Sequence, residues 1–217
     1  MFDLYLFDLD GTLVDTRVDI AEAVNHVFQL HGRPTAQLTT VISWVGDGLD
    51  DMMAKAFDTD DVELIDQLVA EFRAFYGEHC TDFSHLYEGC DRTLAALQQG
   101  GAHLSVLTNK PEDLSREILR RLGVLGYFEH VVGPTDAELR KPNPSNLLSL
   151  VRDVGTTTEK TLMIGDSRND ILVARNASVA SCGCTFGYAG REGLAVLQPT
   201  YLVDALPEIL ALPGPGD

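Results

Sequence analysis

The sequence lacks any long uninterrupted apolar run and any recognisable leader. No stretch reaches the roughly 18 apolar residues that a membrane-spanning helix needs. Its first residues contain no basic segment followed by a small-residue cleavage site. We therefore expect a cytoplasmic protein without a membrane partner.

Lysine is scarce, and basic residues as a whole are outnumbered. The chain has 33 acidic and 16 basic residues, for a net charge of -17. Only four of the basic residues are lysines: Lys55, Lys110, Lys141 and Lys160. Such a balance disfavours nucleic acid and anionic membranes as partners. An acidic protein that handles an anionic substrate needs a metal ion and a few well-placed cations.

The cysteines and histidines show no metal-binding or redox spacing. The four cysteines contain no Cys-x-x-Cys pair, and the six histidines show no ligand spacing. Cys182 and Cys184 stand alone in an apolar stretch, whereas a zinc site needs more ligands at fitting intervals. The composition therefore predicts reduced, mostly buried thiols.

Apolar strand-like runs alternate with segments of helical periodicity along most of the chain. This alternation is typical of an α/β fold in which helices cover both faces of a parallel sheet, a three-layer Rossmann-like core. The predicted strands are Phe2–Phe7, Leu104–Leu107, His130–Val132, Leu162–Ile164, Val179–Cys182 and Tyr201–Val203.

One segment interrupts this rhythm. Residues 16–81 show helical periodicity without a convincing strand, which predicts a helical cap domain inserted after the first strand. Residues 1–15 and 82–217 would then form a discontinuous catalytic core. Gly46 and Gly48 suggest a tight loop between cap helices, either a plain turn or a loop that faces the substrate.

Two carboxylates follow the first predicted strand. Asp8 and Asp10 stand before Gly11, and residues two apart in an extended chain point to the same side. Carboxylates that close together at a strand end are costly unless a cation or a reaction uses them. This pair is the first candidate for chemistry.

Three further motifs carry polar side chains at the ends of other elements. Thr108 and Asn109 follow a predicted strand and could donate hydrogen bonds to phosphate oxygens. Lys141 precedes Pro142 at the start of a helix, and it suits a phosphoryl oxygen or a carboxylate. Each motif is weak alone, since turns and solvated loops use the same residues.

The last motif repeats the pattern of a strand that ends in Gly and Asp. Asp166 follows Gly165, and Asp170 stands four residues later at the start of a predicted helix. Asp166 or Ser167 could also serve simply as a helix N-cap. In a parallel sheet these motifs would meet at the carboxyl edge, where clustered carboxylates require a hard cation, best Mg²⁺.

Together the four motifs resemble the haloacid dehalogenase superfamily of aspartyl phosphatases over Phe7 to Asp170. Trp44–Gly48, Thr108–Pro111 and Gly183–Tyr188 look most similar to its phosphoglycolate phosphatase branch. The resemblance implies a parallel-sheet core with a helical cap. It also implies a Mg²⁺-dependent phosphatase that acts through an aspartyl-phosphate.

The resemblance also implies a role for each motif residue. Asp8 would be the nucleophile, Asp10 the acid and base, and Lys141 a catalytic cation. Thr108, Asn109 and Lys141 would bind the phosphoryl group. The metal would be held by Asp8, the backbone carbonyl of Asp10, and Asp166, with Ser167 and Asp170 supporting the metal and Lys141. Asp15 and Thr16 would only begin the link to the cap.

Two positions depart from the family pattern. Ser178 stands where the family usually has glycine at a left-handed helix end. Asp47 replaces an expected asparagine in the cap loop and adds a negative charge near a doubly anionic substrate.

The expected substrate is 2-phosphoglycolate, with another small metabolite, a sugar phosphate or pyrophosphate, as the alternative. A phosphomutase is disfavoured, because the cap holds only Arg17, Arg33, Lys55 and Arg73 to grip a second phosphate. A non-catalytic relative is the least favoured, since the motif residues are intact. We expect a monomer or homodimer.

Overall fold

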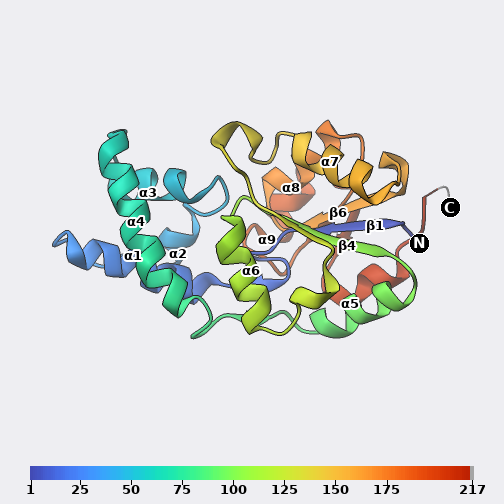
Figure 1. The fold of residues 1–217 in the computed structure, drawn as a ribbon, viewed down its shortest axis with the longest axis horizontal. Helices are drawn as coiled ribbons and strands as arrows, with labels where there is room; N and C mark the ends of the chain where they lie inside the picture. Colours follow the sequence, from blue (N-terminus) through green and yellow to red (C-terminus); the bar gives the residue numbers. More distant parts are fainter. Residues whose placement is uncertain (216–217) are drawn as a thin grey trace.

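The core is a six-stranded parallel sheet with the order β5-β4-β1-β6-β7-β8. The computed structural model describes residues 1–215. The predicted α/β fold class is confirmed, and each predicted strand overlaps an observed one (Figure 1). The strands are β1 (Leu4–Phe7), β4 (His103–Leu107), β5 (His130–Val132), β6 (Thr161–Gly165), β7 (Ala180–Cys184) and β8 (Tyr201–Val203).

Helices cover both faces of this sheet. The side chains of β1 show why, because Tyr5 and Phe7 belong to one buried cluster while Leu4 and Leu6 belong to another. Alternate residues of a strand point to opposite faces, so each face needs its own apolar cover. One cluster packs against α5 (Cys90–Gln99) and α6 (Glu112–Arg121), and the other against α7 (Ser145–Val154) and α8 (Arg168–Asn176).

The predicted helical segment consists of four helices, and we call residues 17–79 the helical insert. In Figure 1 it lies beside the sheet rather than over either face. Its helices are α1 (Arg17–Leu30), α2 (Leu38–Ile42), α3 (Leu49–Phe57) and α4 (Val62–His79). A short antiparallel pair that the sequence analysis did not predict flanks the insert: β2 (Val14–Asp15) and β3 (His85–Leu86). The predicted division of the chain into two domains stays a prediction.

The insert is docked against the core at several points. The Arg140 guanidinium pairs with Asp50 at 2.5 Å, and Arg73 pairs with Asp113. Arg121 donates to the carbonyls of Gly77 and Glu78. These bonds come from both loops and helices of the core, so they fix the insert against the core at the edge of the sheet.

The remaining elements are short. Helix α9 (Gly190–Ala195) follows β7, and single 3-10 turns connect other elements. These turns span Leu125–Tyr127, Ala137–Leu139, Thr158–Lys160 and Leu206–Ala211. Ser178 follows α8 with φ +56°, so serine adopts there the left-handed conformation for which glycine was expected.

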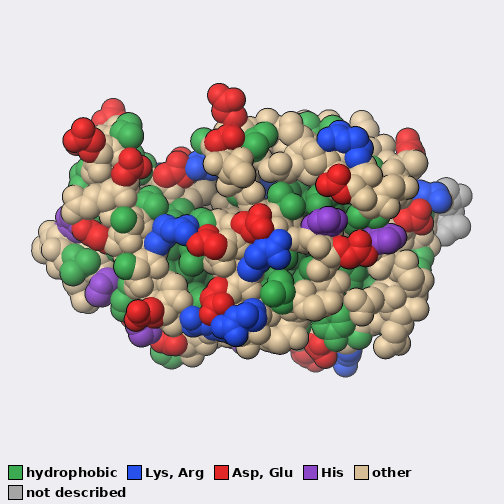
Figure 2. All heavy atoms as spheres, viewed as in Figure 1, with side chains coloured by type: hydrophobic (Ala, Val, Ile, Leu, Met, Phe, Trp, Pro, Cys, Tyr) green, Lys and Arg blue, Asp and Glu red, His purple; other side chains and the backbone are tan. Residues whose placement is uncertain are grey.

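The surface is consistent with the acidic composition. Figure 2 shows Lys and Arg in small groups beside acidic side chains, without a broad basic patch on this face. The four cysteines are buried and free. Within residues 1–215, no helix is both long enough and apolar enough to span a membrane.

Candidate active site

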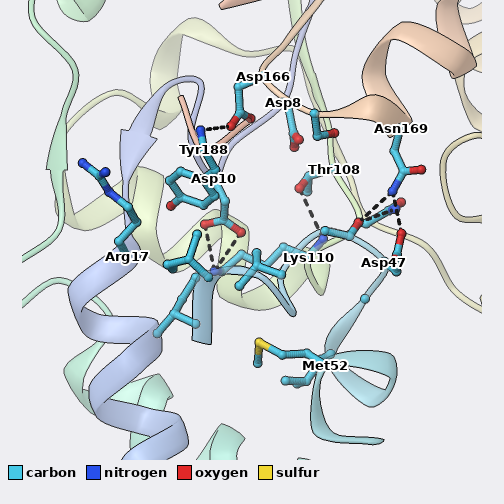
Figure 3. A pocket seen from close by; sticks show the side chains of 18 of the residues that line it. Asp8, Asp10, Arg17, Asp47, Met52, Thr108, Lys110, Asp166, Asn169 and Tyr188 are labelled. Atoms are coloured by element: carbon cyan, nitrogen blue, oxygen red, sulfur yellow. Dashed lines mark hydrogen bonds and ion pairs between the residues drawn. The ribbon is translucent and has the colours of Figure 1, made fainter. Parts of the chain in front are cut away.

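The ends of three adjacent strands bring the sequence motifs together. Asp8 directly follows β1, Thr108 follows β4 and Asp166 follows β6, and these three strands are neighbours in the sheet. All three residues line a cavity of about 660 Å³ between the sheet edge and the helical insert. Figure 3 shows Asp8, Thr108 and Asp166 at one end of this cavity and Met52 near the other, with Asp10 and Lys110 between.

A cluster of three buried carboxylates forms the deepest part of the site. One oxygen from each of Asp8, Asp166 and Asp170 lies within 4.8 Å of the others. Burial and the Asp170 charge raise the pKa of Asp8 to about 6, against the pull of Lys141. Burial, Asp170 and Asp8 raise the pKa of Asp166 well above its usual value. The raised pKa values show that burial and mutual repulsion make the charged forms of these carboxylates unfavourable. A set of carboxylate oxygens of this kind fits a hard divalent cation, which would balance the negative charge.

Lys141 is the one cation inside this cluster. Its ammonium lies 2.9 Å from Asp8 Oδ2 and 2.6 Å from Asp170 Oδ1, and it donates to the carbonyl of Leu107 at 3.0 Å. Burial lowers the pKa of Lys141, but the charges of Asp170 and Asp8 outweigh burial and leave it raised. The lysine is therefore charged, and it fixes one oxygen of Asp8 in place.

Asp166 is held by its neighbours rather than by a cation. Thr12 donates to Oδ1 at 3.2 Å, and the Tyr188 backbone N–H donates to Oδ2 at 2.6 Å. Gly11 has φ +78°, and a Cβ at this position would collide with the Asp166 carboxylate. A glycine is needed here both for its backbone angle and for the space that the carboxylate fills.

Asp170 is engaged at both oxygens, as expected of a supporting residue. Oδ1 accepts from Lys141, while Oδ2 accepts from the Ser167 backbone N–H at 2.9 Å and the Ser167 hydroxyl at 2.6 Å. Ser167 and Asp170 form the capping box of α8. The side chain of Asp170 is fully buried. Asp170 thus helps to cap the first turn of α8 and also holds the ammonium of Lys141.

The Asn109 side chain is occupied by protein groups. Its amide nitrogen donates to the Gly46 carbonyl at 2.9 Å and to the Lys141 carbonyl at 3.0 Å, and its oxygen accepts from the Lys141 N–H at 2.8 Å. Asn109 therefore ties the cap loop to the lysine loop. The Thr108 hydroxyl, near Asp8, opposes in small part the rise that burial causes in the pKa of that carboxyl.

Asp10 does not join the carboxylate cluster, although its neighbour two residues earlier does. The chain has already left β1, and the Asp10 carboxylate turns to Thr16 and Lys110. Thr16 donates to Oδ1 at 2.6 Å, and Lys110 Nζ lies 3.0 and 3.1 Å from the two oxygens. Asp8 and Asp10 line the same cavity, but the chain turns at Gly11 and the Asp10 carboxylate stays outside the cluster of three carboxylates.

Several residues around Asp10 were not predicted from the sequence. Lys110 was visible in the Thr108–Pro111 motif, but its partners are distant in sequence: Asp10, and Tyr76 of α4. Thr16 bonds to Tyr188 as well as Asp10, so it does more than begin the insert. The scarcity of lysine and the Thr108–Pro111 motif were the two signals for Lys110.

Asp47 lies in the cap loop, and its charge is balanced. Lys55 pairs with Oδ2 at 2.7 Å, and the Asn169 amide donates to Oδ1 at 2.8 Å. The bond from Lys55 holds the pKa of Asp47 below its usual value. Asn169 also donates to the Gly46 carbonyl at 3.2 Å. The aspartate is thus a docking group between insert and core.

The wall opposite the carboxylates is apolar. It comes mainly from the helical insert, with Leu114 of α6 beside it. Its other members are Ile20, Leu38, Ile42, Val45, Leu49, Met52 and Phe72. One end of the cavity can therefore hold an anion with a metal ion, and the other excludes water from the reacting group.

The chain is similar to known proteins over nearly its whole length. The family model described as "Haloacid dehalogenase-like hydrolase" matches residues 5–184. The "Phosphoglycolate phosphatase" of Vibrio vulnificus (strain YJ016) is 37% identical over 214 residues, which is 95% of this chain and 94% of the relative. That of Agrobacterium fabrum (strain C58) is 37% identical over 205 residues, or 93% and 88% of the two chains.

A solved structure agrees with this relationship. The structure of a "predicted phosphoglycolate phosphatase" from Haemophilus somnus 129PT superposes with a TM-score of 0.90 at 31% identity, over 97% of both chains. The family match covers the helical insert and all sheet strands except β8, and the relatives and the shared fold cover nearly the whole chain. The chain therefore belongs to the haloacid dehalogenase-like hydrolases.

Proposed function

We propose that this protein is a Mg²⁺-dependent phosphatase that hydrolyses a small phosphomonoester, 2-phosphoglycolate in particular, through an aspartyl-phosphate. The observation that carries the proposal is the Asp8 carboxylate at the cavity end, with one oxygen held by Lys141 at 2.9 Å and Asp166 and Asp170 beside it. This geometry suits a nucleophile whose negative charge is balanced while it approaches another anion.

Asp8 would attack the phosphorus atom with one carboxylate oxygen. Lys141 holds Oδ2, and the Leu9 N–H donates to Oδ1 at 2.7 Å, so the carboxylate is oriented before substrate enters. Mg²⁺, held by Asp8, Asp166 and the Asp10 carbonyl, would neutralise the nucleophile and the phosphoryl oxygens. The Thr108 hydroxyl and Lys141 would stabilise the charge that spreads over those oxygens.

Asp10 would act as acid and then as base. It lies between the carboxylate cluster and the insert, where the leaving group of a phosphomonoester bound to Asp8 would lie (Figure 3). In the first step it would donate a proton to the leaving oxygen, and in the second it would take one from the water that attacks the aspartyl-phosphate. Thr16 and Lys110 hold it at the place where both steps need it.

The substrate proposal rests on the relatives. Proteins named phosphoglycolate phosphatase match both the sheet and the helical insert, which forms the apolar wall. The cavity volume of about 660 Å³ leaves more room than a two-carbon leaving group fills. This favours a second candidate, a phosphomonoester with a larger leaving group.

A panel of phosphorylated metabolites tests the proposal. Purified protein with Mg²⁺ should release phosphate from 2-phosphoglycolate with the highest kcat/KM in a set that includes sugar phosphates, pyrophosphate and an aryl phosphate. A higher kcat/KM for a larger ester would make that ester the proposed substrate, and the proposal of a phosphatase would be kept. Absence of phosphate release from every member would contradict the function itself.

A further inference from the structure

We propose that Lys110 is the specificity residue of the site, and that its ammonium binds a carboxylate carried on the leaving group of the substrate. The inference rests on the proposed phosphatase function and names the feature that the enzyme selects. It concerns a lysine in the cavity wall that neither the nucleophile nor the carboxylate cluster uses.

Lys110 is a buried cation whose donors are all engaged. Its side chain is 8% exposed. The ammonium donates to Asp10 Oδ1 at 3.0 Å, to Asp10 Oδ2 at 3.1 Å, and to the Tyr76 hydroxyl at 2.9 Å. It also lies 4.6 Å from the centre of the Tyr76 ring. The tyrosine belongs to the insert and Asp10 to the core, so the lysine joins the two parts.

The bonds to Asp10 cannot all persist while Asp10 acts on the leaving oxygen. One of its oxygens must then turn from Lys110 to the substrate, and the lysine loses an acceptor. A buried ammonium without a full set of acceptors is unfavourable, and the surrounding Phe72 and Leu114 offer none. A carboxylate on the substrate would take the place of the lost oxygen.

The distances suit a carboxylate close to the ester oxygen. In 2-phosphoglycolate a single methylene separates the ester oxygen from the carboxylate carbon. Asp10 has to contact that ester oxygen, and Lys110 is already within hydrogen-bond distance of Asp10. The ammonium is therefore within reach of a carboxylate at this position.

The other cations around the cavity are less suited. Lys141 is engaged by Asp8 and Asp170. Arg17 is paired with Asp15 through two nitrogens, and Figure 3 shows it to one side of Asp10 and Lys110. Arg168 is exposed at the start of α8. Lys110 alone combines burial with contact to the predicted acid.

The test compares 2-phosphoglycolate with its carboxamide, phosphoglycolamide, which has the same size without the charge. The intact protein should prefer the carboxylate in kcat/KM by tenfold to a hundredfold, on the order expected for a charged hydrogen bond. In Lys110→Met the ratio of the two kcat/KM values should fall to near one, mainly because kcat/KM for 2-phosphoglycolate decreases. Lys110→Arg should keep part of the preference, and Lys160→Met, the same substitution at an exposed lysine outside the cavity, is the matched control that should keep all of it.

A purely structural role of Lys110 predicts that Lys110→Met lowers kcat/KM equally for both esters, so that the preference for the carboxylate stays unchanged. That result would overturn the inference. If Lys110→Met does not fold, as judged by circular dichroism, Lys110→Gln replaces it. If the intact protein hydrolyses both esters equally, or only other phosphomonoesters, the inference about Lys110 is wrong but the proposed phosphatase function is kept. If it hydrolyses no phosphomonoester, the proposed function itself is wrong.

Discussion

The two walls of the cavity differ in polarity. The sheet wall presents the buried polar side chains of Asp8, Thr108 and Asp166 to the cavity, and Lys141 and Asp170 lie close to Asp8. The insert wall, which comprises Ile42, Leu49, Met52 and Phe72 with their neighbours, is apolar. Under the proposed function, the sheet edge would carry out the reaction with phosphate, whereas the helical insert would decide which leaving groups fit.

The largest effect is expected on the sheet wall. Asp8→Asn should lower kcat at least about 10⁴-fold with both an aryl phosphate and the best metabolite, because the amide is no nucleophile. Steady-state phosphate release measures this loss. Asp153→Asn, an exposed change on α7, is the matched control and should leave kcat unaltered. If Asp8→Asn still releases phosphate at an unchanged rate, the nucleophile is a residue other than Asp8.

Metal removal should come next. Chelation with EDTA should reduce activity by about 10³-fold or more, and Mg²⁺ should restore it, because the carboxylate cluster otherwise repels the phosphate dianion. An activity indifferent to chelation would refute the metal proposal.

The same cluster predicts how metal binding depends on pH. The pKa of Asp8 is raised from 3.8 to about 6, so without metal the folded protein retains a proton that the unfolded chain loses. Stability of the metal-free protein should therefore fall as pH rises from about 4 to about 6. Mg²⁺ replaces the proton, so the increase in Tm that it causes should be larger at pH 7.5 than at pH 5. An equal increase in Tm at both pH values would contradict the raised pKa of Asp8.

The insert wall should respond through selectivity. Ile42→Asp adds a negative charge at a half-buried position of the cavity, and it should lower kcat/KM for a carboxylate-bearing ester about tenfold more than for a neutral one. Ile42→Asn changes size and polarity without charge and serves as the control. Equal losses on both esters would show that the insert wall does not discriminate by charge.

The smallest effect is expected at Asp47. Asp47→Asn keeps an oxygen that can accept from Asn169, and Lys55 keeps Asp51 at 2.5 Å, so kcat/KM should stay within about threefold. Asn169→Ala removes the docking bonds themselves and should cost more. A large gain in Asp47→Asn would mean that the charge of Asp47 opposes the substrate after all.

The sheet was predictable because its signals are local. Strands β1 and β6 contain the apolar runs Leu4–Phe7 and Leu162–Ile164, and the polar residues that follow β1, β4 and β6 mark the site. The β2–β3 pair escaped prediction, since two-residue strands such as Val14–Asp15 carry no periodicity. Strand order could not be deduced from the runs alone, because it depends on crossovers through helices.

The site was predictable to the extent that its residues stand in short motifs. Asp8, Lys141, Asp166 and Asp170 meet as the order of motifs suggested. The surroundings of Asp10 were not predictable, because the turn at Gly11 directs its carboxylate to Lys110 and Thr16, and the direction of a side chain in a turn cannot be deduced from a motif. The same applies to the partners of Asp47, which come from α3 and from the start of α8.

The central claim is that the phosphoryl group passes through Asp8. Protein mixed with substrate and Mg²⁺, quenched in acid within one turnover and digested, should yield a peptide that carries a phosphoryl group on Asp8 by tandem mass spectrometry. Asp8→Asn should yield none. Full turnover with no phosphoryl group on Asp8, or with the group on another residue, would contradict the account.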